Sequence, residues 1–153
     1  MTRRSLFPLL ASTAISTSAF LTSPATRAAS STQATLYKNP QCSCCEGYAQ
    51  YLQENGFEVD VKPTNDLAEI SRDAGVPEDL EGCHTMFVGG YVVDGHVPVD
   101  IIRKLLTEKP TIAGITLPGM PSGSPGMTGS KTETWIIYAV MKDGKPPKSF
   151  ATV

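Results

Sequence analysis

Three of the four cysteines stand within four consecutive residues, at Cys42, Cys44 and Cys45, and the fourth is Cys83. The thiolate is the reactive form of cysteine and a soft ligand that selects soft metals such as copper(I). The start of a helix favours this form, because unpaired backbone N–H groups and aligned peptide dipoles lower a cysteine pKa there. The cysteine cluster can therefore bind a soft metal or carry out thiol–disulfide chemistry.

The residues around the cluster predict a strand before it and a helix after it. Residues 34–37 form a short β-prone run that ends at a turn signal, Asn-Pro, at 39–40. Residues 48–52 repeat apolar side chains at helical spacing, and Asn-Gly at 55–56 ends that helix. The three clustered cysteines are therefore expected at the N-terminus of a helix.

Further strands and helices alternate along the chain. Residues 57–62 alternate apolar and charged side chains, as in a half-exposed strand, and 65–75 predict a second helix. Two apolar runs, 82–88 and 91–95, are joined by Gly-Gly and predict an antiparallel hairpin. A strongly apolar helix is expected around residues 101–106.

The resulting order, β-α-β-α-β-β-α with a cysteine cluster after the first strand, is typical of an α/β, thioredoxin-like fold. Cys42-x-x-Cys45 lies where the redox motif of that fold belongs. Beyond this unit, residues 112–128 are rich in Pro, Gly, Ser and Met and predict a loop, and 135–140 predict one additional, last strand.

The first 28 residues differ in composition from the rest. Two arginines at positions 3 and 4 precede an apolar, hydroxyl-rich run over 6–21, and Thr-Arg-Ala at 26–28 fits a cleavage site. We therefore predict a signal peptide over residues 1–28 and a single domain over 29–153, exported to the periplasm by the Sec or the twin-arginine route. The apolar run is too short and too rich in Ser and Thr for a membrane span.

The composition limits the classes of function. The chain is 41% hydrophobic and 18% charged, which is ordinary for a globular domain. Removing residues 1–28 takes away three arginines and no acid, which leaves 10 Lys+Arg against 15 Asp+Glu and a net charge of −5. Such a protein has no electrostatic route to nucleic acid, and no membrane span is expected after the signal.

Four groups of residues, in this order, resemble the motifs of one protein family. They are Tyr37-Lys38-x-Pro40-x-Cys42-x-Cys44-Cys45, Gly82-Cys83-His84-Thr85, Gly90-Tyr91-x-x-x-Gly95-His96-Val97-Pro98 and Leu117-Pro118-Gly119-Met120-Pro121-x-Gly123-Ser124-Pro125-Gly126-Met127. Over roughly residues 34–141 the chain resembles the exported CopG-type proteins of bacterial copper resistance, metal-binding proteins with a domain of unknown function. The resemblance implies a thioredoxin-like fold that binds copper through cysteine thiolates and takes part in copper redox handling.

The residues independently favour copper. In a thioredoxin-like topology the residue before the third strand faces the N-terminus of the first helix, so Cys83 is expected near Cys42 and Cys45. We expect these three with Cys44 to form a copper(I) site, with one ion or several. Zinc is the competing metal, but its sites usually combine two short-spaced pairs of ligands, unlike this crowded cluster and distant Cys-His.

His84, Met120 and Met127 complete the expected ligand set. His84 follows Cys83 directly, and the two methionines lie in the Pro/Gly-rich loop, where no helical period explains them as core filler. His96 is expected to have a surface or structural role, and Lys38 is expected to be solvated.

We therefore expect a periplasmic protein that sequesters, oxidises or passes on copper, with copper ions and other periplasmic copper-handling proteins as its partners. Two alternatives stay open. One is a periplasmic thiol–disulfide oxidoreductase with Cys42 and Cys45 as its catalytic pair, and the other is a domain stapled by disulfides, for which four cysteines allow three pairings. Enzymatic turnover, the number and oxidation state of the ions, the export route and the oligomeric state also stay open.

Overall fold

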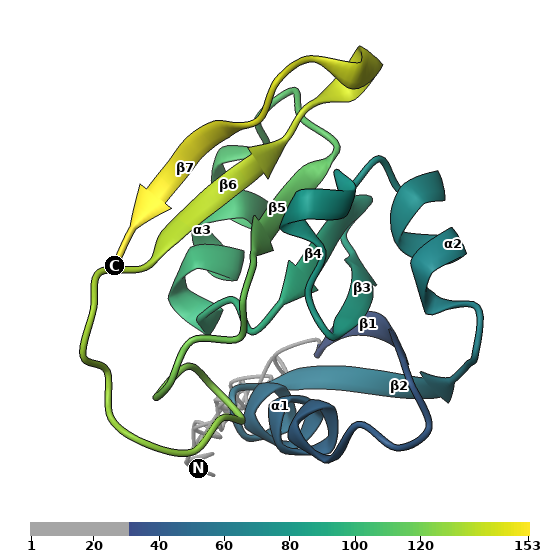
Figure 1. Cartoon of the computed structure of the whole chain (residues 1–153), viewed down its shortest axis with the longest axis vertical. Coiled ribbons are helices and arrows are strands. Elements are labelled where there is room, and N and C mark those ends of the chain that lie inside the picture. The colour runs from purple at the N-terminus through teal and green to yellow at the C-terminus, as the bar shows by residue number, and fades with distance from the viewer. Residues whose placement is uncertain (1–30) are drawn as a thin grey trace, which may run out of the picture.

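Within residues 31–153, seven β-strands form one mixed sheet in the order β2-β1-β3-β4-β5-β6-β7, and three α-helices pack on it (Figure 1). The structure is a computed structural model that describes these residues. The signal peptide expected over residues 1–28 lies outside the described residues. None of the helices in the described part is both long and apolar enough to cross a membrane.

The first unit of the described chain carries the clustered cysteines. Strand β1 (Thr32–Lys38) leads through a turn into helix α1 (Ser43–Glu54), and the chain returns as β2 (Phe57–Pro63). β2 pairs parallel to β1 along its whole length. The predicted strand, cysteine turn and helix are confirmed, and the cysteine cluster lies at the N-terminus of α1.

A hairpin forms the middle of the sheet. After α2 (Leu67–Asp73) and a 3₁₀ turn (Glu78–Leu80), β3 (His84–Val88) pairs antiparallel with β1 and with β4 (Tyr91–Gly95). The predicted Gly-Gly hairpin is confirmed. Its two-residue turn sets the register, in which Thr85 pairs with Asp94.

The last third of the chain extends the sheet. Helix α3 (Val99–Glu108) is followed by β5 (Gly114–Leu117), parallel to β4, and then by β6 (Ile136–Val140), a 3₁₀ turn (Lys142–Gly144) and β7 (Lys148–Thr152).

Two parts of the predicted C-terminal region are wrong. The expected loop over 112–128 contains β5, whose four residues are all buried. The strand near residue 135 is not the last, because β7 pairs with it at the edge of the sheet. β5 is short and flanked by Pro and Gly, and β7 is largely exposed, so neither has the long apolar alternation that identifies a strand.

The main core lies on the face of the sheet that α1 and α3 cover, whereas α2 packs on the other face through a hydrogen bond of 2.6 Å between Ser71 and Thr85. Leu36, Leu52 and Leu105 are fully buried in this core. Burial of each such side chain contributes about 1.5–3 kcal/mol to folding. The core thereby fixes α1, and the cysteines at its start, against β1 and β3.

Candidate metal centre

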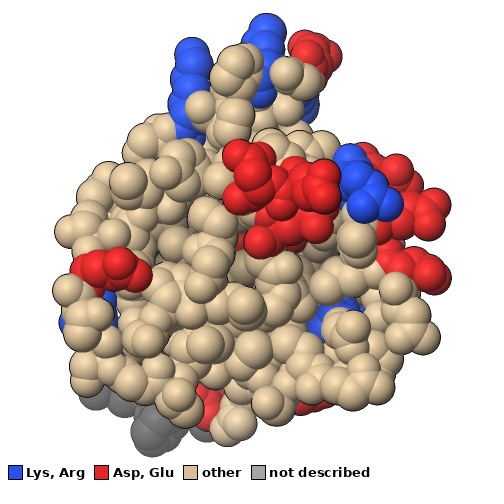
Figure 2. Space-filling model, viewed as in Figure 1, with Lys and Arg blue, Asp and Glu red and all other residues tan. Residues whose placement is uncertain are grey.

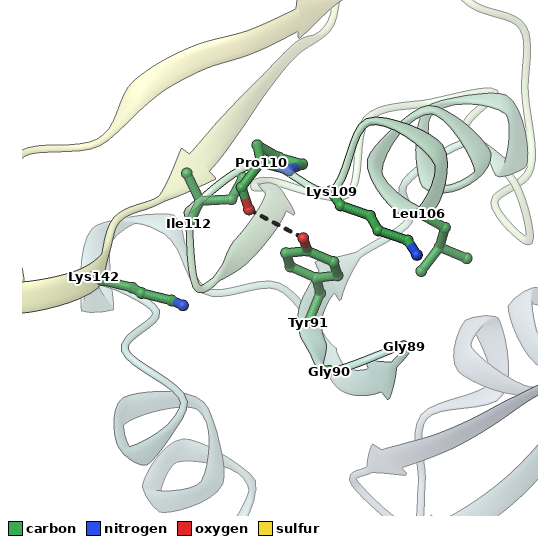
Figure 3. A pocket seen from close by; sticks show the side chains of 8 residues that line it. All are labelled: Gly89, Gly90, Tyr91, Leu106, Lys109, Pro110, Ile112 and Lys142. Atoms are coloured by element: carbon green, nitrogen blue, oxygen red, sulfur yellow. Dashed lines mark hydrogen bonds between the residues drawn. The ribbon is translucent and has the colours of Figure 1, made fainter.

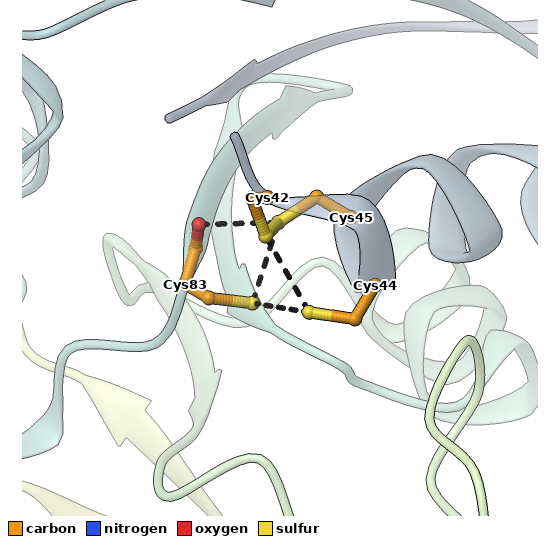
Figure 4. Close-up of side chains that lie close together, drawn as sticks. All are labelled: Cys42, Cys44, Cys45 and Cys83. Carbon is orange, nitrogen blue, oxygen red and sulfur yellow. Dashed lines mark hydrogen bonds between the residues drawn. A yellow bond between two sulfur atoms is a disulfide. The ribbon is translucent and has the colours of Figure 1, made fainter. Parts of the chain in front are cut away.

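Folding brings the four cysteine sulfurs together at the N-terminus of α1 (Figure 4). Cys83 Sγ lies 3.4 Å from Cys45 Sγ and 3.8 Å from Cys44 Sγ, and Cys44 Sγ lies 3.4 Å from Cys42 Sγ. All four sulfurs are within 4.8 Å of one another. The expected approach of Cys83 to the cluster is therefore confirmed.

The cluster is in an oxidised form. Cys42 and Cys45 are joined by a disulfide, and Cys44 and Cys83 are free thiols. A disulfide sulfur cannot act as a thiolate ligand, so this form has two available thiols. The set of four thiolates exists only after the disulfide is reduced.

The turn before Cys42 is held by a buried lysine. Lys38 is 1% exposed, and its Nζ donates to the carbonyls of Asn39 and Pro40 at 3.2 and 3.4 Å. Nζ also lies 2.9 Å from a carboxylate oxygen of Glu46, in the first turn of α1. The expected solvated lysine is wrong, because alternation along β1 places Lys38 on the same face as the core residues of that strand.

A second donor group shares Cys83 with the first. Cys83 Sγ lies 3.5 Å from His84 Nδ1 and 3.0 Å from His96 Nε2, and the three residues form a second set able to hold a metal ion. A surface or structural role is expected for His96; it is fully buried, so the surface part of that expectation is wrong. The signal that locates His96 is the hairpin register, because continuing the ladder from the pair Thr85–Asp94 places Cys83 opposite His96.

Burial keeps both imidazoles neutral and the Cys83 thiol protonated. Burial lowers the pKa of His84 to about 3, with a smaller contribution from His96, and it also lowers the pKa of His96. Burial raises the pKa of Cys83 to about 12, and the neighbouring Cys44 adds to the rise. Neutral imidazole is the form that binds metals, and a bound cation displaces the proton of a thiol.

One nitrogen of the His84 ring has no partner within residues 31–153. His84 Nε2 is buried and has no hydrogen-bond partner among the described residues. An unsatisfied buried polar atom costs about 1–3 kcal/mol. The His84 ring is packed against Tyr48, with ring centroids 4.4 Å apart. The His84 nitrogen that faces Cys83 is Nδ1, so an ion held by Cys83, His84 and His96 together would be bound at Nδ1, and this sulfur and imidazole donor set fits a soft metal ion.

The two methionines differ in their position relative to the cluster. Met120 is 39% exposed, and Met127 is half-buried. Between them, Gly126 packs on the backbone of Cys44 and Tyr48 in α1. Met127 is thus the neighbour of a residue that touches the cysteine helix, whereas Met120 is one of the exposed large apolar residues.

One pocket lies away from the cluster (Figure 3). It has a volume of about 430 Å³ and surrounds the β3–β4 turn, at the opposite end of β3 from His84. Its lining offers no Cys, His or acidic side chain, and Tyr91 Oη in it donates to the carbonyl of Pro110 at 3.0 Å. This pocket is therefore no metal site.

Charged side chains are unevenly placed on the face shown in Figure 2. Acidic side chains gather in the upper middle and at the right of this face, with others at the left and at the tip, and several basic ones stand at the tip that Figure 1 identifies as the β6–β7 hairpin. This face has no continuous basic track of the kind that phosphates of nucleic acid require.

Comparison with known proteins agrees with the donor set. Residues 80–127 match a family described as "Protein of unknown function, DUF411". No curated protein sequence matches significantly. The chain is similar to two solved structures of "Copper resistance protein copG". Form 2 is 31% identical with a TM-score of 0.74 over 80% of this chain and 98% of that chain, and form 1 is 31% identical with a TM-score of 0.72 over 79% and 96%. At this identity over almost the whole of the related chain, the protein belongs to the family of the copper resistance protein CopG.

Proposed function

We propose that this protein binds copper(I) in the periplasm through the thiolates of Cys42, Cys44, Cys45 and Cys83, and that it sequesters copper or passes it on. Its family supports a role in copper resistance. The strand order β2-β1-β3-β4, with Cys-x-x-Cys at the start of α1, supports a thioredoxin-like assignment for the first half of the domain. Composition alone supports the signal peptide and the periplasmic location.

The observation that carries the proposal is the position of Cys83 in both donor groups. A thiolate sulfur has several lone pairs and can bridge two metal ions. With three sulfurs on one side of Cys83, and with His84 and His96 on the other, the arrangement supports more than one ion. The donors are sulfur and imidazole nitrogen rather than carboxylate oxygen, which favours copper(I) over hard cations such as magnesium or calcium.

Met120 and Met127 are proposed as further copper contacts. A thioether is a soft ligand that suits copper(I). The contact of Gly126 with α1 favours Met127 as a ligand near the cluster, and the exposure of Met120 favours a role in receiving or delivering copper.

Copper binding by all four thiolates and the Cys42–Cys45 disulfide exclude each other. Reduction of this disulfide takes up two electrons and two protons from a reductant, breaks the S–S bond and yields two thiols. Metal binding then displaces the thiol protons, which are released to solvent. We therefore propose that a metal-free disulfide form and a copper-loaded thiolate form alternate.

The proposal is tested by loading reduced protein with copper(I) under anaerobic conditions. The mature chain, residues 29–153, is reduced, titrated with copper(I), and analysed for its metal-to-protein ratio and for oxidation state by X-ray absorption. We expect more than one copper(I) per chain, and a ratio reduced to one or less in Cys83→Ser. A wild-type protein that takes up no copper, or that prefers zinc in direct competition, would contradict the proposal.

The Cys42–Cys45 disulfide favours a second candidate, a thiol–disulfide oxidoreductase. Cys44 separates the two functions, because it lies in the copper donor set but outside the Cys-x-x-Cys pair. Under the second candidate, reduction of insulin disulfides is fast in the wild type and survives in Cys44→Ser. Under the first candidate that reduction is slow, and Cys44→Ser lowers the copper ratio.

A further inference from the structure

The segment 118–129, called the Pro/Gly loop below, reaches the donor cluster through one backbone carbonyl. His96 Nδ1 lies 2.5 Å from the carbonyl oxygen of Pro125. A carbonyl oxygen only accepts hydrogen bonds, so Nδ1 carries the hydrogen. A neutral imidazole protonated at Nδ1 has its lone pair on Nε2, and Nε2 is the atom that lies 3.0 Å from Cys83 Sγ.

The position of this carbonyl depends on the glycine that follows it. Gly126 has φ +80°, and a Cβ built on it would lie 2.5 Å from Tyr48 N and 2.8 Å from Cys44 O, on the backbone of α1. Neither atom is a flexible side chain that can move away. Only glycine therefore allows the Pro/Gly loop to touch the helix that carries the cysteines.

Hydrogen bonds inside the loop make it a defined structure around Pro125. Ser124 is 1% exposed, and its amide and hydroxyl both bond to the carbonyl of Pro121, at 3.1 and 2.7 Å. The amide of Met127 donates to the carbonyl of Ser124 at 2.9 Å. Pro125 thus lies inside a closed turn, and a shift of this turn relative to α1 moves its carbonyl.

Helix α1 also contacts His96 and its neighbour directly, through Tyr48. Tyr48 Oη donates to the carbonyl of Val97 at 2.8 Å, and the Tyr48 and His96 rings are 5.3 Å apart in an edge-to-face arrangement. Two contacts therefore fix the position of His96 relative to helix α1. One is made by Tyr48 of that helix, and the other by the Pro/Gly loop, which packs on the same helix.

We propose that Gly126 is a positioning residue for the metal site, which seats the Pro125 carbonyl so that it holds His96 in the Nδ1–H tautomer with Nε2 directed at Cys83. The inference rests on the proposed function only in assigning His96 as a ligand. Metal-binding histidines usually donate their second nitrogen to a carbonyl or carboxylate, and loss of that partner typically weakens metal binding about 10–100-fold.

The first test reads the tautomer of His96 without any metal. The chain has two histidines, so ¹⁵N-histidine labelling of the reduced, metal-free protein gives two sets of imidazole signals, and His84→Gln assigns them. We expect His96 to be protonated at Nδ1 in the wild type and to lose this single tautomer in Gly126→Ala. Gly119→Ala is the matched control, because Gly119 lies in the same loop with φ +78° but has nothing within 4 Å of its Cβ position.

A milder variant covers the case in which Gly126→Ala does not fold. Gly47 faces Gly126 across the same contact, and a Cβ there would lie 3.2 Å from Gly126 O. Gly47 is inside α1, where alanine favours the helix by about 1 kcal/mol, so Gly47→Ala is expected to fold. It is expected to shift the tautomer in the same direction. A wild type protonated at Nε2, or a folded Gly126→Ala or Gly47→Ala with the wild-type tautomer, would overturn the proposal.

The second test measures copper(I) affinity by competition with a chelator. We expect Gly126→Ala to bind about 10–100-fold more weakly and Gly119→Ala to bind like the wild type. A shifted tautomer with unchanged affinity would overturn the role of Gly126 in the metal site. A wild type that has the expected tautomer but binds no copper would instead contradict the proposed function, since the tautomer measurement contains no metal.

Discussion

Cys83 Sγ and His96 Nε2 lie 3.0 Å apart although thirteen positions separate them in the chain. The contact follows from the tight turn between β3 and β4, which places the residue before β3 opposite the residue after β4. It makes Cys83 the one sulfur that touches both the cysteine cluster and the histidines.

Alkylation of the free thiols is expected to be slow at Cys83. Its pKa is raised to about 12, so at pH 8 the reactive thiolate is on the order of 10⁻⁴ of the population. In oxidised Cys44→Ser, Cys83 is the only free thiol; the contribution of Cys44 to its pKa is lost, but burial still raises that pKa. The iodoacetamide rate is therefore expected to keep rising at a pH where the rate of an ordinary thiol has levelled off. Mass spectrometry measures the rate, and rapid modification of Cys83 at pH 7 would contradict the buried, protonated thiol.

Replacing the buried lysine is expected to destabilise the cysteine turn. Lys38→Met keeps the apolar stem but leaves the carbonyls of Asn39 and Pro40 without their donor, which costs about 1–3 kcal/mol in the free energy of unfolding. Lys62→Met is the matched control, because Lys62 makes an exposed ion pair with Asp60 and such changes stay within about 0.5 kcal/mol. Urea unfolding of the oxidised protein measures both. Equal effects would show that the hydrogen bonds of Lys38 to these carbonyls add nothing to stability.

His84 is expected to make the metal-free protein sensitive to acid. Burial lowers the pKa of His84 from its ordinary value of 6.5 to about 3 in the folded protein. Between these two pH values the unfolded chain binds a proton at His84 and the folded chain does not. The stability associated with neutral His84 is therefore complete above pH 6.5 and falls by about 1.4 kcal/mol per pH unit between pH 6.5 and 3. His84→Gln removes this term, so its unfolding free energy, measured by urea, is expected to vary less with pH over this window. Parallel pH curves would refute the assignment.

Asp94 is expected to act in the opposite direction. Burial raises its pKa to about 6, although hydrogen bonds from Thr85 and from the amide of Gly82 oppose the rise. The folded protein therefore binds this proton more tightly than the unfolded chain, and its stability falls as pH rises from about 4 to about 6. Asp94→Asn lacks this titration, so its stability relative to the wild type is expected to increase over that range and level off near pH 7. Thermal or urea unfolding at each pH tests this, and a constant difference would contradict it.

Removing one buried hydroxyl is expected to loosen the support of His96. Tyr48→Phe leaves the carbonyl of Val97 unpaired, with a cost of about 1–3 kcal/mol in unfolding free energy. The ring remains, so the packing against His84 and His96 is kept. Gln50→Ala is a control on the exposed side of the same helix, where only a hydrogen bond to Glu54 is lost. Equilibrium unfolding compares them, and a neutral Tyr48→Phe would show that water or another donor satisfies Val97.

Much of the fold could be predicted from sequence because its signals are local. The alternation in residues 57–62 and the Gly-Gly turn at 89–90 specify their elements with few residues. β5 and β7 could not be predicted in this way. Four buried residues between prolines and glycines carry no period, and an exposed edge strand becomes a strand only because β6 is there to pair with it.

The sequence by itself determined the chemistry: the sulfur donors, their Cys-x-Cys-Cys spacing, and their position at the N-terminus of a helix. Only the tertiary structure decided which distant groups join them. Lys38 is buried because β1 turns that face to the core, and His96 joins Cys83 through the β3–β4 register. Spacing along the chain specifies contacts within an element, whereas contacts between elements depend on packing and on strand register, which no single stretch of sequence contains.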